Sequence, residues 1–241
     1  MPDRPDWSKY LPGSERHPLE DLGELAARLN SPVTFDRRGE VIWVDDFSTG
    51  LTRWRGAGTG GNSDVTVDAD YSYWSGYSAK LYADGVVGGS AGLFRYFSPP
   101  KLGKWGFEIA IAFFSDFYWS QMSMVWDDGS DVYIGTIRLD NDSNELQYYG
   151  SDGHYHKIVD LSTLHYDYGL YHLLKVVIDF ENKTYERVIF NETEYDLTAH
   201  AIETAVTGNV PLKYVNINLT SDKANPDTAR LGAAIVTANE P

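Results

Sequence analysis

Alternation between apolar and polar residues with a period of two runs through most of this chain, and it constrains the fold more than any other feature. From Ser90 onward the alternating segments follow one another, each bounded by glycine, proline or acidic turn residues. This spacing predicts about a dozen short antiparallel strands. No segment with a helical period of useful length interrupts them, which argues against a fold that alternates strands and helices. The sequence therefore predicts an all-β, two-sheet antiparallel sandwich over residues 32–241.

Residues 1–31 have a different composition, with four prolines that each fix φ and remove an amide donor. They predict an extended N-terminal arm that contains one short helix after Pro18, where leucines recur at helical spacing. A helix this short is not stable alone, so its apolar stripe must be buried against another surface. We expect the arm to dock on a neighbouring subunit, and the alternative is a strap over the chain's own sandwich. The residues expected to make this contact are Trp7, Tyr10, Leu11, Leu19, Leu22, Leu25 and Leu29.

The charge of the chain limits its partners. With 20 basic and 35 acidic residues, the formal net charge is −15, which repels phosphate backbones and anionic membrane surfaces. We therefore expect no nucleic-acid partner. No apolar run has the length of a membrane span, and the N-terminal residues lack the apolar core of a secretion signal. We expect no membrane insertion, and a location in a virion or another extracellular assembly reached without that signal, or otherwise in the cytoplasm.

The first strand of the sandwich domain and the stretch after it have distinct patterns. Residues 41–46 are apolar on both faces before ending in two acids, which is typical of a central strand that is covered on both sides. Residues 55–64 contain four glycines, but they lack the lysine and the following helix of a phosphate-binding loop. We predict a flexible surface loop at residues 55–64.

Several stretches carry a resemblance to a known superfamily. Residues 41–54, VIWVDDFSTGLTRW, resemble the opening strand and turn of concanavalin A-like jelly-roll domains. Residues 75–81, SGYSAKL, are similar to a segment of carbohydrate-binding jelly rolls, and the hairpins at residues 140–145 and 149–155 resemble those of laminin-G-like domains. The resemblance covers about residues 40–240 as a pattern. It implies a jelly-roll sandwich of the lectin and glucanase kind.

Catalytic residues are not evident in this pattern. A glycoside hydrolase of this fold needs two carboxylates about 5 Å apart across a cleft, whereas Glu108 stands alone in an apolar strand. A buried and satisfied glutamate is the simpler interpretation. The spacing of the histidines defines no catalytic pair for a polysaccharide lyase, and no nucleophile elbow is present. We therefore predict no catalytic residues and a protein that is not an enzyme.

Calcium is the ion with the best support, because jelly rolls often bind it near the first and last strands through carboxylates and carbonyls. Asp45 and Asp46 match that position loosely and are the candidate ligands of a structural calcium ion. The last strand lacks the paired aspartates that would complete such a set. No other cofactor is expected.

Three functions remain open. The first is a structural protein of a virion, a capsid decoration or tail-associated protein of a tailed phage, whose arm joins a homo-oligomer, with a trimer favoured, or binds a capsid or other particle protein. The second is a carbohydrate-binding module that stacks a glycan on exposed loop aromatics. Its candidate residues are Trp54, Tyr73, Trp74, Tyr118 and Trp119. The third is a sandwich hydrolase or lyase. Only the first explains the arm, so the sequence favours it.

Overall fold

The structure is a computed structural model that describes residues 36, 38–73, 76–98, 102–114, 117–161, 164–167, 169–207, 211–221 and 225–241. All strands belong to one compact unit, Arg38–Pro241. The predicted arm with its helix and its seven contact residues lies outside the described residues, as do residues 32–35 of the predicted sandwich domain. Within the described part, no helix has the length and apolar character needed to cross a membrane.

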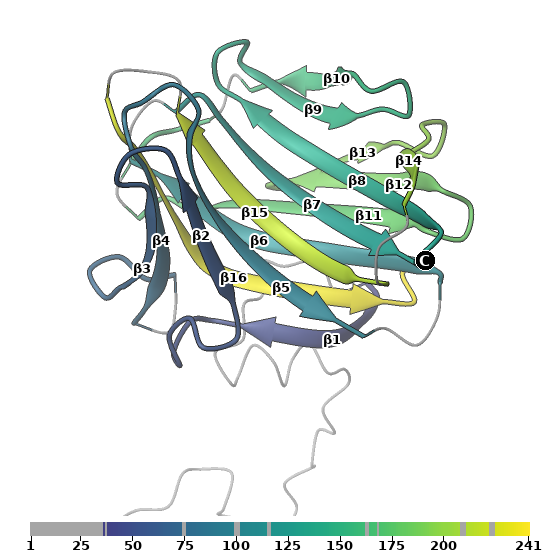
Figure 1. Cartoon of the computed structure of the whole chain (residues 1–241), viewed down its shortest axis with the longest axis horizontal. Coiled ribbons are helices and arrows are strands. Elements are labelled where there is room, and N and C mark those ends of the chain that lie inside the picture. Colours follow the sequence, from purple (N-terminus) through teal and green to yellow (C-terminus); the bar gives the residue numbers. More distant parts are fainter. Residues whose placement is uncertain are drawn as a thin grey trace, which may run out of the picture. The chain divides into compact units, whose positions relative to one another are not determined.

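Sixteen strands of the described residues form two antiparallel sheets that pack face to face (Figure 1). Sheet A has the order β13-β12-β11-β6-β16-β4-β3, with β1 paired to the last part of β16. Its strands are β1 (Glu40–Asp45), β3 (Asp64–Asp68), β4 (Ser78–Ala83), β6 (Lys104–Phe113), β11 (His172–Asp179), β12 (Thr184–Phe190), β13 (Thr193–Asp196) and β16 (Asp227–Ala238).

Sheet B has the order β10-β9-β8-β7-β15-β5-β2, with β14 paired to β8. Its strands are β2 (Arg55–Thr59), β5 (Gly89–Phe97), β7 (Trp119–Asp127), β8 (Asp131–Asp140), β9 (Glu145–Tyr149), β10 (Tyr155–Asp160), β14 (Glu203–Val206) and β15 (Lys213–Ser221). Neighbours in each sheet are often distant in sequence, because the chain crosses repeatedly between the sheets. The predicted all-β, two-sheet antiparallel sandwich is confirmed.

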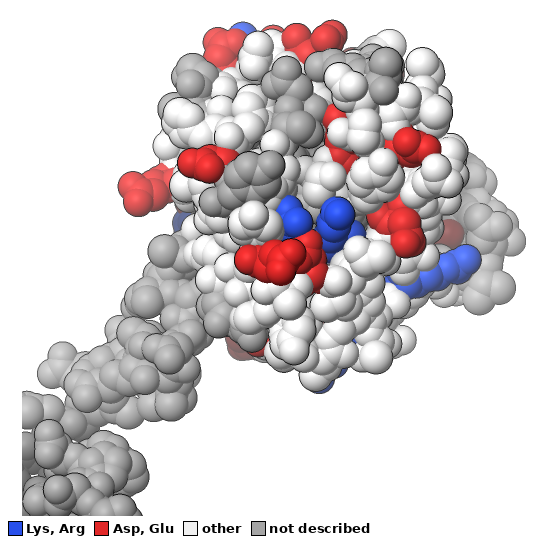
Figure 2. Space-filling model, turned by 90° about the vertical axis from the view of Figure 1, so that its left-hand side faces the viewer, with Lys and Arg blue, Asp and Glu red and all other residues white. Residues whose placement is uncertain are grey.

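Alternation along the strands builds the core between the sheets. In β6, Trp105, Phe107 and Ile109 point inward and are almost fully buried, while Gly106 and Glu108 lie on the outer face of sheet A. The inward residues of both sheets form one apolar cluster. On the surface, Figure 2 shows acidic side chains spread over one side of the molecule around a small group of basic ones, in line with the net charge.

One edge of β8 is shared by two short strands, β9 and β14, and a phenol from sheet A fills the place between them. Tyr185 OH accepts a hydrogen bond from Thr136 N at 2.8 Å, and it lies 3.1 Å from Thr136 O and 2.8 Å from Tyr149 O. Gly135 leaves room for the opposite sheet, because a Cβ there would lie 2.1 Å from Ile178 Cδ1. The backbone of sheet B is thereby hydrogen-bonded to a side chain of sheet A.

β1 is not the central, doubly covered strand that its sequence predicts. Among the described residues it pairs with β16 alone, and Val41, Ile42 and Val44 are 62%, 45% and 46% exposed. Trp43 instead packs against the core, with its ring centroid 5.2 Å from that of Trp54. Two apolar faces therefore do not distinguish a central strand from one whose outer side chains meet solvent.

The glycine-rich stretch after Trp54 is not the flexible loop that we predicted. Its first half, Arg55–Thr59, is β2, which pairs with β5 at the edge of sheet B, and a short turn then leads to β3 in sheet A. A Cβ on Gly58 would lie 2.0 Å from Ser63 O. The glycines allow two backbones to approach where the chain crosses from one sheet to the other.

Candidate ligand-binding face

The outer face of sheet B carries amides, hydroxyls and aromatic rings. Alternation turns the apolar residues of its strands into the core and these polar and aromatic residues outward. We call the following set the sheet B outer face: Phe94 and Tyr96 of β5, Tyr214, Asn216, Asn218 and Thr220 of β15, Trp119, Gln121 and Ser123 of β7, Thr136 and Arg138 of β8, Gln147 of β9, and Tyr155 of β10.

A row of polar groups crosses four strands of this face. Gly92 of β5, Asn218 of β15 and Gln121 of β7 are in register, and Arg138 of β8 continues the row. The absence of a side chain on Gly92 lets Asn218 lie close to β5 at the end of the row, because a Cβ there would lie 3.1 Å from Asn218 Oδ1. The row therefore offers amide and guanidinium groups to a polar ligand that lies across the strands.

Arg138 is held in place by its neighbours on the face. Its Nε and Nη2 donate to Gln147 Oε1 at 3.0 and 2.6 Å, and its Cζ lies 3.7 Å from the centre of the Tyr155 ring. Tyr155 OH donates to Gln121 Oε1 at 3.1 Å. Burial raises the pKa of Tyr155, although the Arg138 charge opposes this shift, so the phenol keeps the proton that it donates. These contacts fix Gln121 and Arg138 in one geometry.

Two oxygens on this face have no hydrogen-bond partner among the described residues. They are Asn216 Oδ1 and Thr220 Oγ1, both buried atoms of β15. By contrast, the hydroxyls of Ser123 and Thr136 beside them bond to each other at 2.8 Å. A buried acceptor without a donor costs about 1–3 kcal/mol, so such atoms call for an explanation. They are acceptors that lack a donor within the described part of the fold.

Aromatic rings stand at both ends of the face. Trp119 begins β7 and is in register with Thr220, and its ring is half-buried. At the other end, the ring of Tyr214 lies 6.1 Å from that of Phe94 and 5.7 Å from that of Tyr96. The structure thus places Trp119, one of the predicted stacking residues, on the same face as the unpartnered oxygens.

The other predicted stacking residues that are described, Trp54, Tyr73 and Tyr118, are not on this face. Trp54 is 8% exposed and belongs to the core, so the prediction that it stands on an exposed loop is wrong. Tyr73 packs against Tyr171, with ring centroids 5.0 Å apart, and Tyr118 is half-buried in the loop before β7. Trp74 lies outside the described residues. The five predicted aromatics therefore do not gather into one site.

The candidate calcium ligands have partners within their own turn. Asp45 accepts hydrogen bonds from Phe47 N at 2.8 Å and from Trp54 Nε1 at 3.2 Å. Asp46 Oδ1 accepts from Ser48 N at 3.0 Å and from Ser48 Oγ at 2.6 Å. Among the described residues, no three histidine, aspartate or glutamate side chains are grouped to hold a metal ion. These contacts give both aspartates a structural role, and calcium binding stays a prediction.

Glu108 is buried on the outer face of sheet A, with 2% of its surface exposed. Its Oε2 lies 3.8 Å from Lys175 Nζ, which in turn lies 2.7 Å from Glu240 Oε1. Gly106 is needed here, because a Cβ at that position would lie 2.8 Å from Glu240 Oε1. This arrangement agrees with the interpretation of Glu108 as a buried glutamate, with the Lys175 ammonium as its charge partner at 3.8 Å.

Sequence analysis missed the polar part of the sheet B outer face. A signal was present in YVNINLT, residues 214–220, where amides and a hydroxyl alternate with apolar residues. The same alternation is typical of any strand with one face in solvent. The strand order is needed to see that these residues meet Gln121 and Arg138, which come from distant parts of the chain.

Comparison with known proteins supports the fold. A carbohydrate esterase from the Shiga toxin-encoding bacteriophage phi24B superposes with a TM-score of 0.51 at 13% identity, covering 84% of this chain and 100% of that chain. The chain has a concanavalin A-like sandwich fold. At this identity the likeness shows the fold alone, and a concanavalin A-like sandwich is compatible with glycan binding and with glycan hydrolysis.

Two further structures are similar to this concanavalin A-like sandwich. Bacillus licheniformis β-glucanase has a TM-score of 0.49 at 15% identity, covering 83% of this chain and 99% of its own. The potassium-bound carbohydrate recognition domain of Emp46p has a TM-score of 0.45 at 10% identity, covering 82% and 94%. No protein-family profile and no curated protein sequence matches the chain.

Proposed function

We propose that this chain binds a glycan through the sheet B outer face without cleaving it. The observation that carries the proposal is the pair of unpartnered buried oxygens, Asn216 Oδ1 and Thr220 Oγ1, on the same face as the half-buried indole of Trp119. Sugar hydroxyls supply the donors that these oxygens lack, and an indole stacks on the apolar face of a pyranose ring. Gln121 and Asn218 add amide donors and acceptors between them.

The carboxylates at the edge of the face support binding rather than hydrolysis. Asp140 and Glu145 are opposite each other on β8 and β9. Arg138 Nη2 lies 2.7 Å from Asp140 Oδ2, and Glu145 Oε2 accepts from Gln147 Nε2 at 2.7 Å. A hydrolase needs two carboxyl groups that are free to act on the bound sugar. Here each carboxyl group is already bonded to a neighbouring side chain of the face.

Calorimetry with a panel of soluble neutral oligosaccharides tests the proposal. Trp119→Ala removes the stacking surface, so we expect the affinity for the recognised glycan to fall by about tenfold or more. Tyr77→Ala is the matched control, because Tyr77 is also an exposed aromatic, at 43%, but lies outside the sheet B outer face. Equal losses in the two variants, or release of reducing ends from the bound glycan, would contradict the proposal.

We also propose that residues 1–31 join this chain to copies of itself, as the prolines and the apolar stripe of that segment support. Deleting them is expected to leave the folded sandwich and to abolish the oligomer, because the described strands begin at Glu40. Sedimentation velocity measures the oligomeric state, and far-ultraviolet circular dichroism checks the fold. An unchanged oligomeric state after the deletion would contradict a role in assembly.

A further inference from the structure

Two adjoining hollows open at one end of the sandwich, away from the residues of the sheet B outer face that the proposed function uses. They share Phe97 and Trp105 in their walls. The larger hollow has a volume of about 290 Å³ and is also lined by Ile42 and Leu102. This is close to the lower end of the range for small-molecule sites, about 300–1,000 Å³, so a ligand with one ring fits its size.

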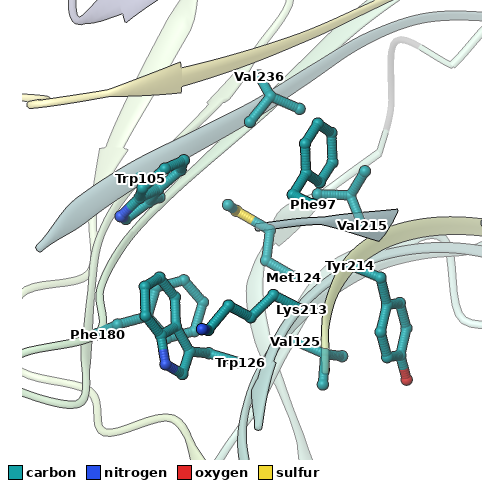
Figure 3. Close-up of a pocket in the computed structure, with 10 residues that line it drawn as sticks. All are labelled: Phe97, Trp105, Met124, Val125, Trp126, Phe180, Lys213, Tyr214, Val215 and Val236. Carbon is teal, nitrogen blue, oxygen red and sulfur yellow. The ribbon is translucent and has the colours of Figure 1, made fainter. Parts of the chain in front are cut away.

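The smaller hollow has aromatic walls. Trp105, Trp126 and Phe180 are 6%, 6% and 2% exposed. The ring centroids of Trp105 and Trp126 lie 6.0 Å apart and those of Trp126 and Phe180 lie 5.7 Å apart, so each ring is held by its neighbour. Figure 3 shows these rings on one side of the hollow, with Phe97 and Val236 across it. The hollow between them has a volume of only about 20 Å³, too small for a ring, so a ring-shaped ligand meets this aromatic wall only at Trp105, from the larger hollow.

A lysine enters this aromatic hollow. Lys213, the first residue of β15, extends toward Trp126 and Phe180 (Figure 3), and its Nζ lies 4.6 Å from the centre of the Trp126 ring. No described carboxylate forms an ion pair with it, in a chain with 35 acidic residues. Asp127, next to Trp126 in β7, accepts a hydrogen bond from Gly129 N instead. The ammonium group is thus available to an anion.

Two side chains with hydrogen-bond donors that are unsatisfied among the described residues, Arg95 and Trp43, lie behind Phe97. The guanidinium carbon of Arg95 lies 5.5 Å from the centre of the Phe97 ring. The ring centroid of Trp43 lies 5.7 Å from that of Phe97. Arg95 Nε and Trp43 Nε1 are buried and have no acceptor among the described residues. Arg95 donates to Arg53 O but pairs with no described carboxylate. Two donors without a described acceptor thus lie behind Phe97, although neither Arg95 nor Trp43 lines the hollows themselves.

Of the two charged groups at the rim, Lys104 is ion-paired and Glu40 is hydrogen-bonded to an amide. Glu40 Oε2 accepts a hydrogen bond from Asn239 Nδ2 at 2.9 Å, and Lys104 Nζ lies 3.2 Å from Glu186 Oε1. Neither rim charge competes with Lys213 as the anchor of an anion.

We propose that this end of the sandwich is a second binding site, which takes a small aromatic carboxylate. The ring lies in the larger hollow against Trp105 and Leu102, and the carboxylate pairs with Lys213 Nζ. The preference for an anion comes from Lys213, whose partner in the free protein is an aromatic ring. Of the sheet B outer face, Tyr214 also lines this site, whereas Trp119, Asn216 and Thr220 do not.

Three probes with the same ring and different charge test the proposal on the full chain: phenylpropionate, phenylpropanol and phenylpropylamine. Titration is followed by tryptophan fluorescence and by calorimetry. We expect phenylpropionate to bind about tenfold more tightly than the alcohol, and the amine more weakly than either. Equal affinities for the three, or no saturable binding of phenylpropionate, would overturn the proposal.

Two variants locate the site, and a third is the control. In the Lys213→Met variant, we expect the affinity for phenylpropionate to fall to that for phenylpropanol. The affinity for phenylpropanol should be the same as in the wild-type protein. Leu102→Trp fills the larger hollow from a position that is 39% exposed, and it is expected to remove binding of all three probes. Lys80→Met removes another lysine that lies over an aromatic ring, that of Tyr82, and should change nothing. An anion preference that survives Lys213→Met would contradict the assignment.

Discussion

The outer faces of the two sheets both carry polar residues, but the polar groups on the two faces differ in their charge and in their partners. On sheet A, Lys175, Glu240 and Arg187 are 2%, 5% and 6% exposed, and their charges are paired with one another. On the sheet B outer face the groups are mostly neutral, and two oxygens, of Asn216 and Thr220, have no described partner. Polar groups that satisfy each other stabilise a fold, whereas unpartnered ones indicate a place for a ligand.

The charged group on sheet A is the part of this comparison where a single change has the largest effect. Lys175→Met leaves the carboxylates of Glu240 and Glu108 buried without their ammonium partner. Removing one member of a buried ion pair costs about 3–5 kcal/mol, so we expect the free energy of unfolding to fall by that amount. Urea unfolding followed by fluorescence measures it.

Lys157→Met is the control for that experiment. Lys157 lies on β10 of sheet B, and its Nζ forms an exposed ion pair with Asp160 at 2.6 Å. Because solvent screens such a pair, its loss should leave the urea midpoint almost unchanged. If Lys175→Met and Lys157→Met lowered the free energy of unfolding by similar amounts, the charged group on sheet A would not be the more stabilising one.

A smaller effect is expected from pH, and it also originates in sheet A. Burial lowers the pKa of His172 in β11 below its ordinary value of 6.5, although the hydrogen bond with His165 O partly opposes this shift. The unfolded chain then binds a proton more readily than the folded one. The free energy of unfolding therefore falls as pH drops below about 6.5, and the fall ends below the folded pKa.

The variant His172→Gln isolates this contribution. Between about pH 7.5 and pH 5.5 the wild-type protein should lose up to about 1 kcal/mol more stability than the variant. Urea unfolding at both pH values measures the difference. Parallel pH dependence in the two proteins would mean that another group titrates.

The smallest effect on stability is expected on the sheet B outer face. Thr220→Val replaces a hydroxyl that has no described partner with a methyl group of similar size, so the free energy of unfolding should change by less than about 0.5 kcal/mol. Glycan affinity should nevertheless fall by about fivefold, the equivalent of one hydrogen bond of about 1 kcal/mol. A large loss of stability with unchanged binding would reverse the roles that we assign to the two faces.

The fold was largely predictable because a period of two over many segments has few solutions. Each predicted strand from β5 to β13 is present, since each has its own turn residues. Residues 203–206 form β14, which we did not predict, because ETAV has no apolar alternation and depends on its pairing with β8. β1 and β2 were misjudged for the related reason that sequence pattern does not report which strand lies at an edge.

The candidate site was predictable only in part. Trp119 was identified by its position in an aromatic cluster next to a turn, a local signal. Trp54 was also predicted to stand on an exposed loop, but Asp45 provides an acceptor for its indole inside the fold. The polar row depends on the order in which β5, β15, β7 and β8 pair, and this order is set by the whole sandwich rather than by any segment.

The hydrogen bonds of Tyr185 affect how the two sheets resist a shearing force. Its hydroxyl belongs to sheet A, yet it bonds to backbone atoms of β8 and β9 in sheet B, at Thr136 and Tyr149. The sheets of a sandwich are otherwise held by side-chain packing, which resists separation better than sliding. With this phenol in place, a shearing force must break directed bonds before one sheet can move over the other. The Thr136 amide should accordingly exchange with deuterium only when the whole sandwich opens.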